Sequence, residues 1–274
     1  MRVLIKAYQF LNLISIDVAC GAMVCAAFFA NIFQVQLRIY GIASLGLSVW
    51  IIYTLDHLLD SRQLSKRAST LRLQFHQRHF KMLSMLLIVA GMLDVYLIMN
   101  IRRPVFSWGL VLVGIVTLYL ILQRWISPFK EIVGAFLYSG GVLLPTLSLQ
   151  THIVSMSLIF FIIAFTLTAL INLIIFSMLD IENDLKHAQS SFATTFGYQK
   201  TRRTLIILFL IHGLIVLQLL ISSSYRVECF ILLLMNSVLM AMFIQSDNFK
   251  YHERYRLVGD IIFLFPLPYL ILNA

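Results

Sequence analysis

The chain has 274 residues, of which 60% are hydrophobic and only 12% are charged, and its mean hydropathy is +0.90. A soluble protein needs more polar side chains to cover its surface, so this composition excludes the soluble classes and predicts a polytopic membrane protein. The net charge of +9 is typical of a protein whose loops meet anionic lipid. We therefore expect membrane lipid as a partner, and no nucleic acid.

Apolar runs long enough to cross a hydrocarbon core, about 20 residues each, recur along the chain. Asp17 interrupts the first of them, but hydrophobicity continues well beyond it, so we expect a retained first helix. The longest run holds two spans, with a turn near Pro145 and the polar Gln150-Thr151-His152. We predict an all-α bundle of about nine transmembrane helices that forms one integral-membrane domain, 1–274. The predicted spans are 18–37, 39–55, 82–101, 104–123, two within 132–179, 204–225, 229–246 and 255–272.

The distribution of positive charge predicts the orientation, because lysine and arginine are retained on the cytoplasmic side. With nine spans and a cytoplasmic amino terminus, all but four of the 21 lysines and arginines fall on inner segments. The four on outer segments are Arg38, Arg102, Arg103 and Arg226. We expect a bacterial inner-membrane protein whose carboxyl terminus lies outside.

Two aspartate pairs, Asp56-x-x-x-Asp60 and Asp180-x-x-x-Asp184, end apolar stretches on the same predicted side, and with Glu182 they include five of the 12 acidic residues. This spacing places both carboxylates of a pair on one helical face. Four converging carboxylates repel one another unless a cation lies between them, and hard oxygen ligands suit Mg²⁺ bridged to a phosphate. The pairs predict a diphosphate substrate in a cytoplasm-facing cavity. The alternative is that they mark the water interface and pair with nearby arginines.

At these motifs the sequence resembles the UbiA superfamily of intramembrane prenyltransferases. The resemblance rests on I-Y-T-L-D-H-L-L-D at 52–60, D-I-E-N-D at 180–184, Lys130-Glu131 and Phe196-Gly197. It implies nine helices, Mg²⁺, a prenyl diphosphate donor and a lipophilic acceptor, such as an aromatic ring or a quinone precursor. Ile52 stands where the family usually has Asn, and Ala188, Ser190 and Ser191 where it tends to have Gly and Lys-Thr. These departures indicate a divergent branch.

The resemblance implies a role for each part of the site. Asp56, Asp60, Asp180 and Asp184 hold Mg²⁺, which acts on the diphosphate leaving group. Aromatic side chains shield the allylic cation from water. The candidates by depth are Tyr53, Tyr119, Phe136 and Tyr138. Cationic side chains suit phosphate oxygens, although snorkelling to lipid headgroups is the competing interpretation. The candidates are Arg62, Lys66, Arg67, Arg72, Lys130 and Lys186.

Other polar residues leave alternatives open. Asp17 and Asp260 are candidates for an acceptor base or for interhelical hydrogen bonding, and for Asp94 we expect an ion pair with Arg102 or Arg103. His76-x-x-His79 lacks the Cys or carboxylate that a zinc site needs. Two other functions are retained: a membrane protein that binds the isoprenoid diphosphate or lipid without turnover, and a secondary transporter.

Overall fold

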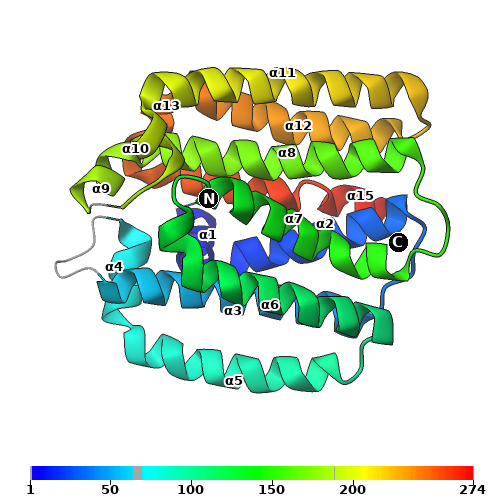
Figure 1. The fold of residues 1–274 in the computed structure, drawn as a ribbon, viewed down its shortest axis with the longest axis horizontal. Coiled ribbons are helices and arrows are strands. Elements are labelled where there is room, and N and C mark those ends of the chain that lie inside the picture. The colour runs from blue at the N-terminus through cyan, green and yellow to red at the C-terminus, as the bar shows by residue number, and fades with distance from the viewer. Residues whose placement is uncertain (1, 64–69, 188, 274) are drawn as a thin grey trace.

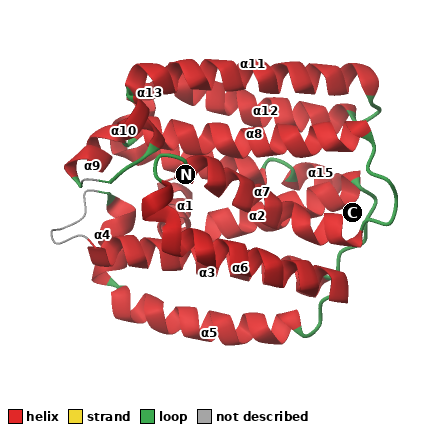
Figure 2. Cartoon of the chain, in the orientation of Figure 1, coloured by secondary structure: helices red, strands yellow, loops and turns green. Residues whose placement is uncertain are grey.

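In the computed structural model, the described residues (2–63, 70–187 and 189–273) form an all-helical bundle in which no strand is drawn (Figures 1 and 2). The fold class is as predicted. The helices are α1 (Arg2–Leu13), α2 (Ile16–Ile32), α3 (Ile39–Gln63), α4 (Leu71–Arg78), α5 (Phe80–Ile98), α6 (Arg103–Ile126), α7 (Lys130–Leu149), α8 (Met156–Leu179), α9 (Ile181–Lys186), α10 (Phe192–Phe196), α11 (Tyr198–Ser222), α12 (Arg226–Ile244), α13 (Ser246–Lys250), α14 (Arg254–Ile261) and α15 (Leu267–Leu272). Two 3₁₀ segments, Tyr251–Glu253 and Ile262–Leu264, flank α14.

Among the described residues, 8 helices are long and apolar enough to cross a membrane, and a bent pair brings the number to 9. The bent pair consists of Lys6–Leu13 and Ile16–Ile32, which meet at 85°. Ser15 lies at the corner with φ of 57°, in the left-handed region. The prediction of about nine spans is confirmed, but the sequence did not reveal this corner.

Burial differs strongly between the spans. α8 is apolar on all faces, and 56% of its most apolar stretch is buried inside the protein. The reason is that α7, α11 and α12 pack around it. A helix that is hydrophobic all round is buried in this way. In α6 only 6% of the corresponding apolar stretch is buried, so most of this helix is available to lipid. α6 packs chiefly against α7, while α3 packs against α2 and α5.

Local signals set several helix ends. Thr70 caps α4 by accepting a hydrogen bond from the Leu73 amide at 3.5 Å, and Ser155 caps α8 in the same way through Leu158 at 3.4 Å. The predicted turn between α7 and α8 begins at Gln150, whereas Pro145 lies inside α7. α4, which follows the first aspartate pair, and α9, which contains Asp184 of the second, lie at the same end of the bundle (Figure 1).

Candidate functional site

A cavity of about 890 Å³ opens among the helices and is lined chiefly by residues of α3, α6, α7, α8 and α14, with further residues from α2, α4, α5 and α9. Along α3 the lining extends from Gly41 to Asp60, which corresponds to roughly 28 Å of helix. Its walls are mostly apolar, and its acidic and basic residues gather at the end of the bundle where α3 and α8 finish. The cavity therefore combines a polar end with a long apolar interior.

Both aspartate pairs line this one cavity: Asp56 and Asp60 from α3, and Asp180 and Asp184 from the end of α8 and from α9. The two pairs are separated by more than a hundred residues of sequence, and the helical packing brings them to the same space. The four aspartates, predicted at the ends of apolar stretches on the same side of the membrane, therefore line one space.

The first pair lies on a continuous helix. The Asp56 carboxylate accepts a hydrogen bond from Gln123 Nε2 of α6 at 3.2 Å. Lys130, at the start of α7, also lines the cavity, as does Ile52 one turn before Asp56. An apolar side chain thus replaces the amide that the family resemblance leads one to expect at this position.

The second pair lies at a helix break. α8 ends at Leu179, α9 begins at Ile181, and the Asp184 amide still donates to the Asp180 carbonyl at 2.9 Å. The expected one-turn spacing is therefore present. Burial raises the pKa of Asp184, while a hydrogen bond from Ser191 and the charge of Lys130 lower it. Lys130 therefore acts electrostatically on the second pair.

Asp180 is already paired within the protein. Its Oδ2 forms an ion pair with Arg256 Nη2 at 2.5 Å, and its Oδ1 accepts a hydrogen bond from the Tyr255 hydroxyl. Both partners belong to α14, which approaches α8 closely at Gly259. A Cβ atom there would overlap Phe176 and Asn172 of α8.

Arg256 is a cavity residue that the sequence analysis missed. The sequence predicted only that it lies on the inner side, at the start of the last span. Its one local signal is the Arg-x-Arg of 254–256 at the start of that span, which is equally typical of a membrane-interface anchor.

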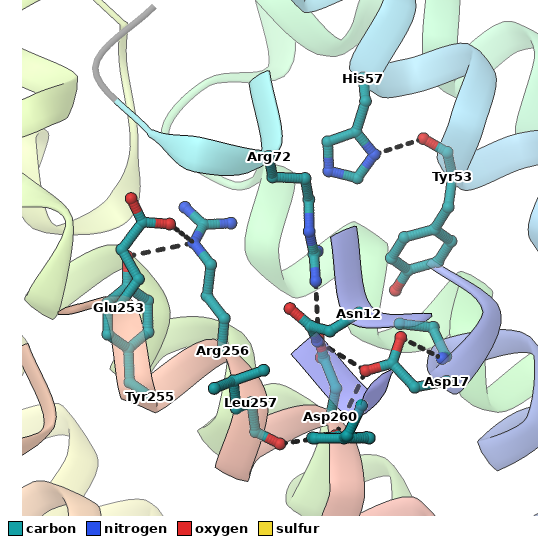
Figure 3. A network of polar contacts seen from close by, with 12 residues as sticks. Asn12, Asp17, Tyr53, His57, Arg72, Glu253, Tyr255, Arg256, Leu257 and Asp260 are labelled. Carbon is teal, nitrogen blue, oxygen red and sulfur yellow. Dashed lines mark hydrogen bonds and ion pairs between the residues drawn. The ribbon is translucent and has the colours of Figure 1, made fainter. Parts of the chain in front are cut away.

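A second buried network surrounds Arg72, whose Nη2 forms an ion pair with Asp260 Oδ2 at 3.0 Å. Asn12 Nδ2 joins two carboxylates in this network, donating to Asp260 at 2.9 Å and to Asp17 at 2.6 Å. Figure 3 shows the arrangement, with Arg72 extending from α4 toward Asp260. Asp17 and Asp260 thus take part in interhelical hydrogen bonding, which is one of the two alternatives left open.

The predicted cationic residues separate into two groups. Arg72 and Lys130 line the cavity, whereas Arg62 and Lys186 are exposed and are not among the described lining residues. The sequence placed all of them near phosphate because it could not resolve on which side of a helix end each side chain lies. Lys66 and Arg67 lie outside the described residues.

Three of the four predicted aromatic residues line the cavity: Tyr53, Tyr119 and Tyr138. The prediction for Phe136 was wrong, because its side chain is 61% exposed on the outside of α7. The cavity face of α7 includes Gly134 and Tyr138. Phe136 lies two positions before Tyr138, a rotation of about 200° around the helix axis, so it lies on the opposite face. The Tyr138 hydroxyl is buried without a hydrogen-bond partner.

The prediction for Asp94 was also wrong. This carboxylate accepts hydrogen bonds at 2.7 Å from the hydroxyls of Ser44 and Ser48, which lie on α3. Its predicted arginine partners follow it along the chain, whereas the serines come from a packed neighbouring helix. Helix packing therefore satisfies Asp94 without an ion pair.

The histidines near the cavity make local contacts. His57 Nδ1 lies 2.5 Å from the Tyr53 carbonyl oxygen, and the rings of His57 and His76 are 5.1 Å apart. Burial lowers the pKa of His76. His57 and His187 line the cavity, but the contacts described for His57 do not include a carboxylate.

The donor set partly fits Mg²⁺. Within the described part of the chain, no three His, Cys, Asp or Glu side chains converge as a preformed metal site. Mg²⁺ is usually bound through one or two carboxylates, waters and substrate phosphates, so the oxygen ligands of Asp56, Asp60 and Asp184 suit it. Glu131 adds a buried Oε2 atom without a partner in the cavity wall. Asp180 does not fit, because both of its oxygens are already paired.

No protein-family model and no curated protein matches the sequence. Solved structures do match over nearly the whole chain. A UbiA homologue from Archaeoglobus fulgidus bound to GPP and Mg²⁺ is 14% identical with a TM-score of 0.67, covering 95% of this chain and 98% of that one. The apo structure of a UbiA homologue from Aeropyrum pernix K1 is 10% identical with a TM-score of 0.70, covering 93% and 98%.

A third match is a digeranylgeranylglyceryl phosphate synthase structure, 12% identical with a TM-score of 0.56, covering 96% of this chain and 97% of that one. Identities this low establish the fold alone. The helical bundle, its membrane spans and these likenesses together show that the chain has the UbiA fold, in a divergent sequence.

Proposed function

We propose that the protein is a membrane prenyltransferase that moves an isoprenoid group from a prenyl diphosphate to a lipophilic acceptor, such as an aromatic ring or a quinone precursor. The observation that carries the proposal is that two aspartate pairs from distant spans line one cavity, together with Lys130, Arg72 and a long apolar interior. A structure with the same fold was solved with GPP and Mg²⁺.

In this proposal the polar end of the cavity holds the diphosphate and the apolar interior holds the prenyl chain. Asp56, Asp60 and Asp184 are the carboxylates proposed to hold Mg²⁺, which when bound supplies Lewis-acid stabilisation of the leaving group. Lys130 and Arg72 add positive charge toward the diphosphate oxygens. The carbon–oxygen bond breaks as diphosphate departs, and the acceptor forms the new bond at that carbon and then loses a proton to solvent.

The cavity walls exclude water from the cation that forms when diphosphate leaves. Tyr53, Tyr119 and Tyr138 present aromatic rings at this site, and ring faces attract positive charge. Water exclusion matters because hydrolysis would otherwise compete with transfer.

The proposal places the mouth of the cavity on the cytoplasmic side of a bacterial inner membrane. It rests on the bias of lysine and arginine toward that side of the predicted topology. In Figure 1 the carboxyl end lies near the end of the bundle opposite α4 and α9, whereas the amino end lies among the helices.

The test is to incubate purified protein with Mg²⁺, radiolabelled prenyl diphosphates and a lipid extract as the source of acceptor. We expect transfer or diphosphate release that disappears in Asp56→Ala and in Asp184→Ala. Glu182→Gln is the matched control, because this neighbouring acid is exposed and pairs with Lys250 instead of lining the cavity.

The rival function is binding of the diphosphate without turnover, and the apolar Ile52 and the paired Asp180 are the observations that favour it. Mg²⁺-dependent binding with neither release nor transfer would support this rival. Failure to bind any prenyl diphosphate would contradict both functions.

A further inference from the structure

Arg256 is the cavity cation closest to the second aspartate pair, and three groups of the protein hold it. Nη2 lies 2.5 Å from Asp180, while Nε lies 3.2 Å from the Tyr255 hydroxyl oxygen and 3.6 Å from Glu253 Oε2. The side chain is 17% exposed, so the guanidinium is fixed in position but still reaches the cavity surface. The contacts described for Arg256 leave Nη1 for a ligand.

This pairing changes what Asp180 can do. One of its oxygens is bound by the guanidinium, and the other accepts from the Tyr255 hydroxyl and, at 3.3 Å, from Asn183. A divalent ion at Asp180 would have to displace Arg256 or compete with its charge. Displacing a guanidinium from a largely buried ion pair is unfavourable, because it leaves a charge without its partner.

Arg72, on α4, is held by an aspartate in a similar way. Asp260 holds its Nη2, and its Nε is buried without a hydrogen-bond partner in the cavity wall. In Figure 3 the two arginines extend from different helices, Arg72 from α4 and Arg256 from α14. In both cases an aspartate fixes one edge of a guanidinium, and the planar fork suits a phosphate group at another edge.

We propose that Arg256 binds the diphosphate of the substrate at the second aspartate pair, and that Asp180 is its positioning residue and not a metal ligand. This inference rests on the proposed function. Metal binding is then confined to Asp56, Asp60 and Asp184, and Arg256 supplies the positive charge at Asp180 that a further divalent ion would otherwise provide.

The experiment measures diphosphate binding and metal binding separately in the purified protein. Affinity for geranyl diphosphate and for inorganic diphosphate is measured at saturating Mg²⁺, and Mn²⁺ affinity is measured by the electron paramagnetic resonance of free Mn²⁺. The variants are Asp180→Asn, Arg256→Gln, the double variant and Asp56→Asn. The control is Arg254→Gln, because Arg254 is exposed, stacks on Tyr251 at 5.4 Å and does not line the cavity.

We expect Asp180→Asn and Arg256→Gln each to weaken binding of both diphosphates by about tenfold or more, the size of one charge-assisted contact. The double variant should be little weaker than either single one, because Asp180 acts through Arg256. Mn²⁺ affinity should remain unchanged in Asp180→Asn and fall in Asp56→Asn. Arg254→Gln should match wild type.

Four results decide against the inference. If Asp180→Asn lowers Mn²⁺ affinity as Asp56→Asn does, Asp180 is a metal ligand. If Arg256→Gln leaves affinity for inorganic diphosphate unchanged, Arg256 does not bind it. Wild-type protein that binds no prenyl diphosphate would overturn the proposed function as well. Arg256→Lys keeps the charge but loses the fork, so it should fold and bind with intermediate affinity; full wild-type affinity would contradict recognition by the guanidinium.

Discussion

The two aspartate pairs have the same spacing and line the same cavity, but their surroundings differ. Asp56 lies on the continuous helix α3 and accepts a hydrogen bond from the neutral Gln123. Asp180 lies at the break between α8 and α9 and is paired with Arg256 and Tyr255. The first carboxylate of the same Asp-x-x-x-Asp spacing therefore differs between the pairs. Asp56 is suited to bind a metal ion, whereas Asp180 is already paired with a cation of the protein.

The largest expected effect tests the first pair directly. Asp60→Asn should weaken binding of geranyl diphosphate by at least about 100-fold at limiting Mg²⁺, since loss of even a residue that supports a metal ligand costs 10- to 100-fold. The effect should shrink as Mg²⁺ is raised. The measurement is a binding titration at several Mg²⁺ concentrations, and unchanged affinity would count against metal binding by this pair.

The next effect compares the two pairs without any ligand. Asp180→Asn leaves Arg256 largely buried beside a neutral partner, so we expect a loss of about 3 kcal/mol in unfolding free energy. Asp56→Asn should change it by less than about 0.5 kcal/mol, because an amide oxygen still accepts from Gln123. Thermal unfolding in detergent measures both. Equal destabilisation would remove the distinction between the pairs.

A smaller effect is expected at Tyr255, whose hydroxyl donates to Asp180. Tyr255→Phe removes that donor while leaving the ring packed against Phe176, with ring centroids 5.4 Å apart. Because the hydroxyl also accepts a hydrogen bond from Arg256 Nε at 3.2 Å, two hydrogen bonds are lost, and we expect a loss of about 2 kcal/mol, since each contributes about 1 kcal/mol. The thermal midpoint of this variant should lie between those of wild type and Asp180→Asn, and a midpoint below that of Asp180→Asn would contradict our ordering.

The smallest effect is expected at Glu182, which lies between the paired aspartates in sequence but forms an exposed ion pair with Lys250 at 2.6 Å. This contact lowers the pKa of Glu182, so the small stabilisation is present above its unfolded pKa and is lost as the pH falls. Glu182→Gln should leave the thermal midpoint at neutral pH unchanged, because exposed ion pairs contribute little. A clear shift in the thermal midpoint would mean that an exposed charge near the second pair affects stability.

Much of the architecture followed from sequence. Hydropathy predicted the membrane class and about nine spans, since an apolar run of about 20 residues is long enough to cross the hydrocarbon core as a helix. The spacing of the aspartates predicted that each pair shares one helical face, and their positions at helix ends predicted a common end of the bundle. These properties are local or depend on the order of spans, so no knowledge of packing was needed.

Only the tertiary structure decided which side chains meet. Arg256 reaches Asp180 across 76 residues, and Asn12 reaches Asp260 across 248, because α14 packs against α8 in the middle of the chain and against α1 and α2 near its start. Packing of α5 against α3 gave Asp94 its serine partners, and Phe136 was left exposed on α7. A sequence pattern limits the depth and face of a residue, but the partner of a buried charge is set by the neighbouring helix, which spacing along the chain does not encode.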